Sequence, residues 1–424
     1  MADEFLDCLI SPYTDVFLIG DKAILYSYIT GKHRTVSAAN VRDRVITLPR
    51  KKINELVALH LVESDDCADS YLDYRCVRDI ARYSHKALDV VLHLNYDCNL
   101  RCPYCYQNNV DKNVVMAPES LDRVSEKIIS MLEGGPYKKL FLTLIGGEPT
   151  LHPEMIHRIS DKLVGIKVPV SGIVVCNGTI LTKQMIRDCI RIGRFTFDIT
   201  LDGAEKYHDQ LRYYPDGAGS FQEILENIET IQSQFPEIDL TINCNLSQKN
   251  INGVDDLCKS LKRIHYQGNL VFSEVFLSPH SSYDSVLGKR GTEWYEAVKT
   301  AESYGFINTA FSRTSHLGCG MYNSDTFFID PFGEVSSCIN AIGNPRYKQS
   351  TFINHGLVSF DFARSKRIES EGLLSSYCKL CKFLPICEGS CTYLNETVKK
   401  RCPRWSLEHN ERRILQEHLI KGLE

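Results

Sequence analysis

The sequence predicts an α/β protein with a parallel sheet at its centre, a small α+β domain before it and a cysteine-rich domain after it. Apolar runs alternate with helical patterns from Ala87 to Leu277, which is typical of βα units. A chain of 424 residues is too long for one ordinary core. Seven of the 17 cysteines lie after residue 318. The predicted domains are 1–80, 87–305 and 306–424.

The first 80 residues predict a β-hairpin followed by a helix. Two apolar runs, 15–19 and 22–26, flank Gly20-Asp21 as the strands of a hairpin flank a turn. From Pro49 to His60 the apolar residues recur at helical spacing. The segment resembles the small winged-helix-like domain of peptide-modifying enzymes, in which an edge strand captures a precursor peptide. A plain structural cap is the other interpretation.

Six strands are expected in the central region, with helices between them. Pro118–Leu132 and Ser220–Gln234 are predicted helices, because apolar residues fall on one face of each. Ligands of such sheets bind at the C-terminal ends of the strands. The expected strands are Leu88–Leu94, Leu140–Ile145, Ser171–Cys176, Phe195–Leu201, Leu240–Leu246 and Leu270–Leu277.

Three cysteines follow the first predicted strand. Cys98, Cys102 and Cys105 have the spacing C-x3-C-x2-C, with Tyr104 before the last. Three thiolates hold three irons of a 4Fe–4S cluster and leave the fourth iron open. A structural zinc site uses four ligands, usually in two C-x2-C halves, and scattered structural thiols are a further alternative. The second predicted strand ends in a Gly-Gly-Glu-Pro turn, residues 146–149.

The three cysteines together with this turn resemble the radical S-adenosylmethionine (SAM) superfamily. The resemblance implies a partial (β/α)6 TIM-like barrel, with SAM on the open iron of the cluster. Tyr104 would lie against the adenine. The turn formed by Gly146, Gly147, Glu148 and Pro149 would bind the methionine amino group.

The fourth predicted strand carries a second resemblance. Thr200-Leu201-Asp202-Gly203, followed by His208-Asp209, Arg212 and Gly219-Ser220-Phe221, is similar to the subgroup with a C-terminal SPASM domain. By this resemblance, the Thr200 hydroxyl and Arg212 would contact the ribose or carboxylate of SAM. A plain turn and a solvated helix start are the alternative interpretation of these residues.

The last third of the chain fits the SPASM pattern. Cys319 and Cys338 bracket Gly333, and five more cysteines follow. Since each 4Fe–4S cluster takes up to four thiolates, seven cysteines favour two auxiliary clusters over a zinc ribbon, which would leave three unused. The resemblance assigns Cys378, Cys381, Cys387 and Cys402 to one cluster, and Cys319, Cys338 and Cys391 to the other.

The second auxiliary cluster lacks a fourth cysteine. Anaerobic sulfatase-maturing relatives have one six residues before the first ligand, where this chain has Arg313, and a catalytic Asp where it has Ile339. A substrate Cys thiolate, another side chain or water are the candidate ligands. Four spare cysteines are also candidates, although apolar packing is the expected role of Cys176, Cys189, Cys244 and Cys258.

Composition excludes some partners. A net charge of −4 gives no footprint for nucleic acid. The acidic start lacks the pattern of a signal peptide, and no apolar run is long enough for a membrane span. Many cysteines without an export signal indicate a reducing cytoplasm and metal binding.

The sequence therefore predicts a radical SAM oxidoreductase that modifies a ribosomally made peptide. The cofactors would be SAM and three 4Fe–4S clusters, and a flavodoxin or ferredoxin would donate electrons. The product would be a thioether or another crosslink, and the precursor peptide could contain Cys. Alternatives are formylglycine formation in a sulfatase, oxidation of a small molecule or cofactor precursor, and a non-catalytic electron carrier. The peptide, the attacked residue and the oligomeric state are not encoded in these motifs.

Overall fold

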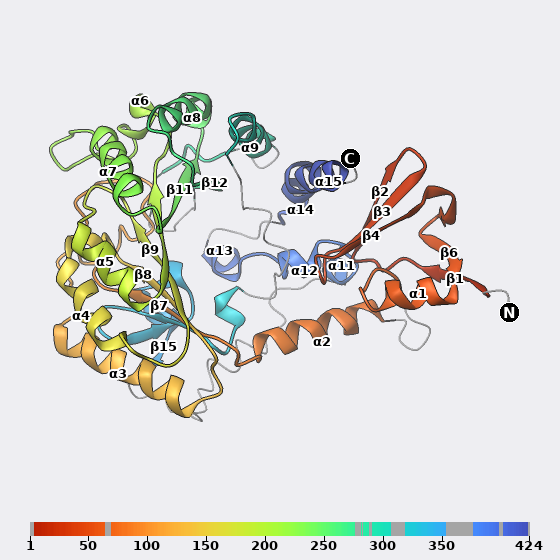
Figure 1. Cartoon of the computed structure of the whole chain (residues 1–424), viewed down its shortest axis with the longest axis horizontal. Helices are drawn as coiled ribbons and strands as arrows, with labels where there is room; N and C mark the ends of the chain where they lie inside the picture. Colours follow the sequence, from red (N-terminus) through yellow and green to blue (C-terminus); the bar gives the residue numbers. More distant parts are fainter. Residues whose placement is uncertain are drawn as a thin grey trace. The chain divides into compact units, whose positions relative to one another are not determined.

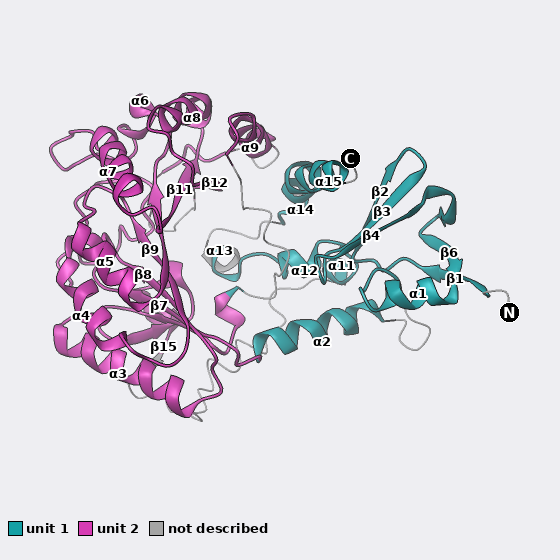
Figure 2. Cartoon of the chain, in the orientation of Figure 1, with its two compact units in different colours: residues 1–83, 311–319, 370–424 teal, residues 84–310, 320–369 magenta. Residues whose placement is uncertain are grey.

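The computed structural model describes residues 4–63, 69–275, 281, 283–287, 291–306, 319–352, 376–397 and 402–422. The chain forms two compact units, coloured teal and magenta in Figure 2. Unit 1 comprises residues 1–83, 311–319 and 370–424, and unit 2 comprises residues 84–310 and 320–369. The predicted boundaries near 80 and 306 remain predictions. Contacts group residues 320–369 with the central sheet.

Unit 2 contains a nine-stranded sheet with the order β12-β11-β10-β9-β8-β7-β13-β14-β15. Neighbouring strands from β7 to β12 pair in parallel, which confirms the predicted α/β fold with six βα units. The six strands are β7 (Leu88–His93), β8 (Leu140–Ile145), β9 (Val170–Cys176), β10 (Arg194–Thr200), β11 (Asp239–Leu246) and β12 (Asn269–Glu274). The predicted sixth strand reached Leu277, which lies outside the described residues.

The two faces of β10 differ in polarity. Phe195, Phe197 and Ile199 are fully buried. A Cβ on Gly178 would meet both Ile199 and Ile224 of α7 (Phe221–Gln234), so this face packs against the helices. Because side chains alternate along a strand, Thr196, Asp198 and Thr200 lie on the opposite face. This polar face belongs to the inside of the curved sheet.

Helices cover the outer face of the sheet (Figure 1). Pro118 begins α3 in the first turn, where its missing N–H costs no hydrogen bond. Leu121, Val124 and Ile128 form its buried stripe. The helices of this unit are α3 (Pro118–Gly134), α4 (Pro153–Leu163), α5 (Lys183–Ile192), α6 (Glu205–His208), α7, α8 (Val254–Arg263) and α9 (Glu293–Ser303).

Three short strands extend the sheet beyond β7. The first, β13 (Thr326–Ile329), pairs in parallel with β7. The next two, β14 (Glu334–Ser336) and β15 (Lys348–Thr351), continue the sheet in antiparallel pairing. Cys338 lies in the short turn after β14, so this extension of the sheet places it in the same unit as β7.

Unit 1 combines the start and the end of the chain. Its strands form two three-stranded sheets, β1-β6-β5 and β2-β3-β4. The predicted hairpin is confirmed, since Ile19 pairs with Lys22 across Gly20, which has a φ of 57°. The strands are β1 (Phe5–Leu9), β2 (Thr14–Ile19), β3 (Lys22–Ser27), β4 (His33–Ser37), β5 (Val41–Arg42) and β6 (Val45–Pro49).

The helices of unit 1 come from both ends of the chain. The predicted helix from Pro49 to His60 is observed as α1 (Arg50–Val57). The others are α2 (Ser70–Arg82), α11 (Ser376–Lys379), α12 (Leu384–Cys387), α13 (Thr392–Thr397), α14 (Arg404–Ser406), the π-helical η9 (Leu407–Glu411) and α15 (Arg412–Lys421). Within the described ranges, no helix combines the length and apolar content that crossing a membrane requires.

Gly172 in β9 provides a test of the packing between neighbouring strands of the sheet. A Cβ there would lie 2.2 Å from the Leu142 carbonyl oxygen and 2.5 Å from the Phe195 ring. We expect Gly172→Ala to lower the free energy of unfolding by about 1–3 kcal/mol through overpacking. Urea unfolding measures the change. Gly422→Ala is the control, since the nearest atom to a Cβ there, the Leu419 carbonyl oxygen, would be 3.6 Å away. Equal stability of the two variants would contradict this packing.

Candidate active site

The three cysteines of the predicted cluster lie in a loop directly after β7. The loop is held by its own backbone and by Arg101. The Arg101 guanidinium donates to the carbonyls of Cys98 and Leu100 at 2.7 and 2.9 Å, and the Arg101 N–H donates to the Tyr213 carbonyl at 2.8 Å. Cys98 Sγ accepts the Leu100 N–H at 3.4 Å. None of the three thiols forms a disulfide, so all three remain available as ligands.

The Gly-Gly turn after β8 packs tightly against the segment that precedes Cys98. A Cβ on Gly146 would lie 1.9 Å from Asn95 Oδ1, and one on Gly147 would lie 2.1 Å from the Asp97 carbonyl oxygen. Only glycine fits either position. The Glu148 N–H donates to the same Asp97 carbonyl at 2.8 Å. The turn and the cysteine loop are therefore positioned together.

Glu148 joins the ends of β8 and β9. Its carboxylate accepts the N–H and hydroxyl of Thr150 at 3.0 and 2.6 Å, and the backbone N–H of Asn177. Burial raises the pKa of Glu148, and these hydrogen bonds oppose the rise. Both carboxylate oxygens are occupied by these bonds, so the side chain stabilises the turn. The backbone of residues 146–148 remains the part suited to contact a ligand.

Asn99, within the cysteine loop, connects this loop to the turn after β9. Its amide donates to Thr179 Oγ1 at 2.8 Å, and its carbonyl accepts the Asn177 amide at 2.7 Å. Asn227 of α7 donates to the carbonyls of Gly178 and Thr179, which fixes the other side of the same turn. Sequence reasoning missed Asn99. Its place inside the cysteine spacing was the available signal.

Tyr104 is buried against a carboxylate and a guanidinium. Its hydroxyl is hydrogen-bonded to Asp202 Oδ2, and Arg212 Nη1 donates to the hydroxyl oxygen at 3.0 Å. Burial raises the pKa of Tyr104 well above its usual value, so the phenol stays protonated. Arg212 Nε is buried without a hydrogen-bond partner in the described part of the chain. Such a donor suits the carboxylate or hydroxyls of a bound ligand.

Asp202 and His208 hold Arg212 in place. Asp202 is fully buried, and its Oδ1 accepts the Asn245 N–H at 2.8 Å. The Asp202 N–H donates to His208 Nδ1 at 3.1 Å, so His208 Nε2 donates to Ser220 Oγ at 3.0 Å. The Ser220 hydroxyl then donates to the Arg212 carbonyl at 2.8 Å. Burial lowers the pKa of His208, which keeps it neutral.

The same segment explains the second sequence motif. Asp209 Oδ1 accepts the N–H groups of Ser220 and Phe221, both at 3.0 Å, at the start of α7. A Cβ on Gly219 would lie 2.1 Å from Asp209 Oδ2. The interpretation of His208 and Asp209 as solvated residues is therefore wrong for His208, which is fully buried. Asp202 likewise belongs to the site and is more than a turn residue.

The inner face of the sheet is polar around β10 and β11. Thr200, the last residue of β10, is 8% exposed and pairs with Asn243 of β11. Ser273 of β12 donates to Asn243 Oδ1 at 3.1 Å. Asp198, on the same face as Thr200, has a buried Oδ1 with no hydrogen-bond partner among the described residues. Burial raises the pKa of Asp198 to about 6.

The spare cysteines lie away from this inner face. Cys176 pairs with Ile199, whose side chain faces the helices, so its thiol has the same orientation. Cys244 and Cys258 lie close enough to interact electrostatically between β11 and α8. Cys189 is buried on α5. These positions favour apolar packing for Cys189, Cys244 and Cys258. Cys176, at the end of β9, lies close enough to Glu148 and Arg212 for their charges to act on its pKa.

The C-terminal cysteines are distributed over both units. Cys378, Cys381, Cys387 and Cys402 line one cavity of about 130 Å³ in unit 1. Cys319 and Cys391 also belong to unit 1, whereas Cys338 belongs to unit 2. Arg313 lies outside the described residues. The Cys338 thiol lies close to Tyr106, the residue after Cys105. Burial is the main cause that raises the pKa of Tyr106, and Cys338 adds to it.

The chemistry of these thiols fits iron–sulfur clusters. Burial raises the pKa of Cys102 and of Cys387 to about 12, and that of Cys98 above its usual value. Such thiols stay protonated at neutral pH unless a metal stabilises the thiolate. No group of three or more His, Cys, Asp or Glu in the described ranges is arranged around a single ion. Cluster thiolates each bind a different iron, so they do not converge on one point as zinc ligands do.

Comparisons with known proteins identify the superfamily that the central region of the chain matches. Residues 93–246 match the Radical SAM superfamily. The radical SAM cyclopropyl synthase TigE of Paramaledivibacter caminithermalis is 26% identical over 162 residues, which cover 35% of this chain and 33% of the relative. A cysteine-type anaerobic sulfatase-maturating enzyme of Clostridium novyi is 25% identical over 176 residues, covering 39% and 46%. The chain thus spans a third to a half of the length of these two relatives.

Solved structures share the fold over more of the chain. The structure of anSMEcpe with bound AdoMet and Cp18Cys peptide is 16% identical and has a TM-score of 0.63, covering 80% of this chain and 100% of that one. Streptococcus suis SuiB bound to precursor peptide SuiA is 15% identical and has a TM-score of 0.57, covering 94% and 98%. At these identities the likeness concerns the fold.

The buried carboxylate of Asp198 predicts a pH-dependent stability. Its pKa is about 6 in the folded chain and near 3.8 when unfolded, so the folded state binds more protons between these values. This contribution is favourable below pH 3.8 and is lost as the pH rises through 6. We expect Asp198→Asn to raise the free energy of unfolding by up to about 3 kcal/mol at pH 8 and to change it little at pH 4. Urea unfolding at both pH values measures the difference, and an equal effect at both would contradict the assignment.

Proposed function

We propose that this chain, in which residues 93–246 form a radical SAM domain, is a maturase of a ribosomally made peptide. The observation that carries the proposal is the loop of three thiols after β7, packed against the Gly146-Gly147 turn and beside the buried Tyr104–Asp202–Arg212 group. A plain electron carrier needs neither an open iron nor a ligand-binding turn beside it. The proposal is therefore catalytic.

Each part of the site has a role toward SAM and its cluster. Cys98, Cys102 and Cys105 would hold three irons. The backbone of Gly146–Glu148, with Pro149 ending the turn, would bind the methionine amino group, and Arg212 and Thr200 would bind the carboxylate or ribose. When bound, the reduced cluster and SAM supply a 5′-deoxyadenosyl radical that removes hydrogen from carbon. The neutral, buried Tyr104 would contact the adenine and exclude water.

The polar part of the inner face, on β10 and β11, is the proposed place of the substrate. Asp198, Thr200 and Asn243 lie on this face, at or near the C-terminal ends of their strands. A carboxylate oxygen without a partner there costs stability, which indicates a role toward a substrate donor. The auxiliary clusters would be held as the sequence suggests, one by Cys378, Cys381, Cys387 and Cys402, the other by Cys319, Cys338 and Cys391.

A peptide partner is supported by the neighbouring structures. Both anSMEcpe and SuiB have been solved with bound peptides, and the SuiB likeness extends over 94% of this chain. The first 83 residues offer the sheet edges on which a precursor peptide could add a strand. A thioether or another crosslink is the proposed product, with a flavodoxin or ferredoxin as electron donor.

Sulfatase maturation is the second candidate, because a sulfatase-maturating enzyme is among the relatives. Ile339 opposes it: the side chain at this position packs with Tyr96 and Ile145 and cannot accept a proton. Formylglycine formation on a sulfatase-derived peptide, detected by its mass, distinguishes the two. A crosslink in a short peptide encoded beside this chain favours the maturase.

The number of clusters is directly measurable. Ten motif cysteines predict about twelve irons and matching sulfide per chain after anaerobic reconstitution, at four irons per cluster. Iron and sulfide analysis gives the value. About four irons with stoichiometric zinc would leave only the barrel cluster and remove the auxiliary assignment.

Two sets of cysteine variants separate the roles. We expect Cys98→Ala to abolish 5′-deoxyadenosine release with dithionite, because the open-iron cluster is lost. Cys381→Ala or Cys387→Ala should keep part of this release and form little modified peptide. Chromatography quantifies both products, and Cys189→Ala on the buried face of α5 is the control. Release of 5′-deoxyadenosine by Cys98→Ala would overturn the central assignment.

A further inference from the structure

We propose that the first 83 residues complete the auxiliary-cluster centre, with Asp15 and Arg82 as positioning residues for the segment from Cys378 to Cys391. The inference rests on the proposed function in one respect: the cavity lined by Cys378, Cys381, Cys387 and Cys402 holds a cluster. It goes beyond that function because it assigns residues at the start of the chain to a centre near its end.

The walls of the cavity belong to cores that the N-terminal strands share. Phe383, which lines the cavity, is buried with Phe17 of β2 and with Tyr28, the residue after β3. Cys381 and Cys387 pack against this cluster. Leu384 also lines the cavity, and it is buried in a second cluster with Tyr13, Ile29 and Tyr74. Cys378 packs against this second cluster. The Phe383 and Tyr28 rings meet edge to face at 5.2 Å. Residues of the first 83 positions therefore pack behind the wall residues Phe383 and Leu384.

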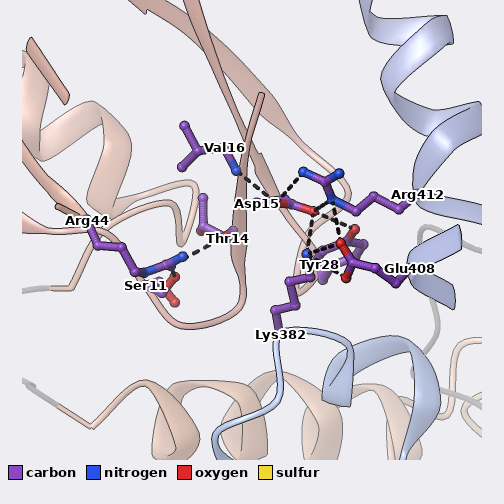
Figure 3. A network of polar contacts seen from close by, with 9 residues as sticks. All are labelled: Ser11, Thr14, Asp15, Val16, Tyr28, Arg44, Lys382, Glu408 and Arg412. Carbon is purple, nitrogen blue, oxygen red and sulfur yellow. Dashed lines mark hydrogen bonds and ion pairs between the residues drawn. The ribbon is translucent and has the colours of Figure 1, made fainter. Parts of the chain in front are cut away.

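A buried carboxylate connects the hairpin to the residue next to Cys381. Asp15 of β2 is 6% exposed. Its Oδ2 lies 2.6 Å from Arg412 Nε and 3.2 Å from Lys382 Nζ, and Tyr28 donates a hydrogen bond to it at 3.2 Å (Figure 3). Burial alone would raise the pKa of Asp15, but Arg412 and Lys382 hold it below its usual value. Lys382 directly follows Cys381 in the sequence. The charge of Asp15 therefore fixes the backbone beside a predicted cluster ligand.

A second buried pair acts at the other end of the segment. Arg82, the last residue of α2, lies 3.4 Å from Glu388, which follows Cys387, and both side chains are less than a tenth exposed. Glu388 has a left-handed backbone with a φ of 48°. Its carboxylate also accepts the backbone N–H of Cys319. One N-terminal arginine thus supports the side chain that connects Cys387 to Cys319.

Tyr13 adds a neutral contact between the two pairs. Its hydroxyl donates to the Lys379 carbonyl at 2.6 Å, directly after Cys378. Each stretch that bears a cavity cysteine between 378 and 388 is therefore fixed by a different N-terminal side chain. Removing Asp15 leaves Lys382 and Arg412 with Glu408, at 2.9 and 3.4 Å, in place of two carboxylates. The weaker pairing lets the ligand-bearing turn open more often. Cluster iron would become accessible to a chelator in the opened state.

The test measures iron loss from the reconstituted full chain to an anaerobic excess of EDTA. Asp15→Asn and Arg82→Gln should each release about four irons per chain at least roughly tenfold faster than the unchanged chain, since a lost charge-assisted bond shifts the opening equilibrium by about that factor. The remaining irons should leave at the unchanged rate. Glu4→Gln is the matched control, because its pair with Arg50 lies in the same unit but is exposed.

A double-variant cycle separates positioning from general loosening. Asp15→Asn takes one of its carboxylate partners from Lys382 and leaves Glu408, 2.9 Å from Lys382 Nζ. Lys382→Met removes the cation itself, so the double variant should lose iron more slowly than the product of the two single effects predicts. Lys382→Met also keeps Asp15 paired with Arg412, which provides a variant expected to fold. Electron paramagnetic resonance should show the change in one auxiliary signal and not in the barrel cluster.

The outcomes are distinct. Iron loss from Asp15→Asn and Arg82→Gln at the rate of Glu4→Gln overturns this inference and leaves the auxiliary cluster intact. About four irons in the unchanged chain overturn the auxiliary assignment itself. The inference is also overturned if all irons are released faster to the same extent and the effects of Asp15→Asn and Lys382→Met simply multiply. That result would indicate a general loss of stability without specific positioning.

Discussion

The buried carboxylate of Asp202 is the contact on which the arrangement of the barrel loops depends. One oxygen accepts the Asn245 N–H from β11, the other is bonded to Tyr104 in the cysteine loop, and the backbone N–H engages His208. A buried charge is stable only while such partners are present. Displacing any one loop would leave a carboxylate without its partners. The loops therefore hold their places together, and the orientation of the cysteine loop follows from a residue about 100 positions later.

Strands and helices that a local pattern of apolar residues determines could be predicted from the sequence. The strand Leu140–Ile145 was predicted with its observed bounds, because an apolar run ends there at Gly-Gly. The sequence could not predict that Asn99 contacts Thr179, 80 residues away, or that Asp202 is more than a turn residue. Such pairs depend on which loops come together in the fold, and hydrophobic periodicity in the sequence does not predict this. Asp15 was assigned only to a strand for the same reason, since Lys382 and Arg412 approach it from the far end of the chain.

One face of β10 stabilises the fold by apolar packing, and the other carries the polar residues of the proposed site. The helix side of β10 is closed by Phe195, Phe197 and Ile199, and the spare thiols lie in the same layer. The inner side keeps Asp198 and Thr200, which an apolar core would not retain without a cost. A protein selected for stability alone would replace Asp198 with an apolar residue. Its presence is consistent with a site whose contents arrive from outside the chain.

The pairing of Asp15 with Arg412 has a consequence for biosynthesis. These residues are 397 positions apart, so at 5–20 residues per second the hairpin waits roughly 20–80 seconds for its partner to be made. During that interval Phe17, Tyr26 and Tyr28 lack the surface that buries them. The hairpin is thus made long before it reaches its final structure. A cell that makes this protein must protect an apolar hairpin until α15 has been made.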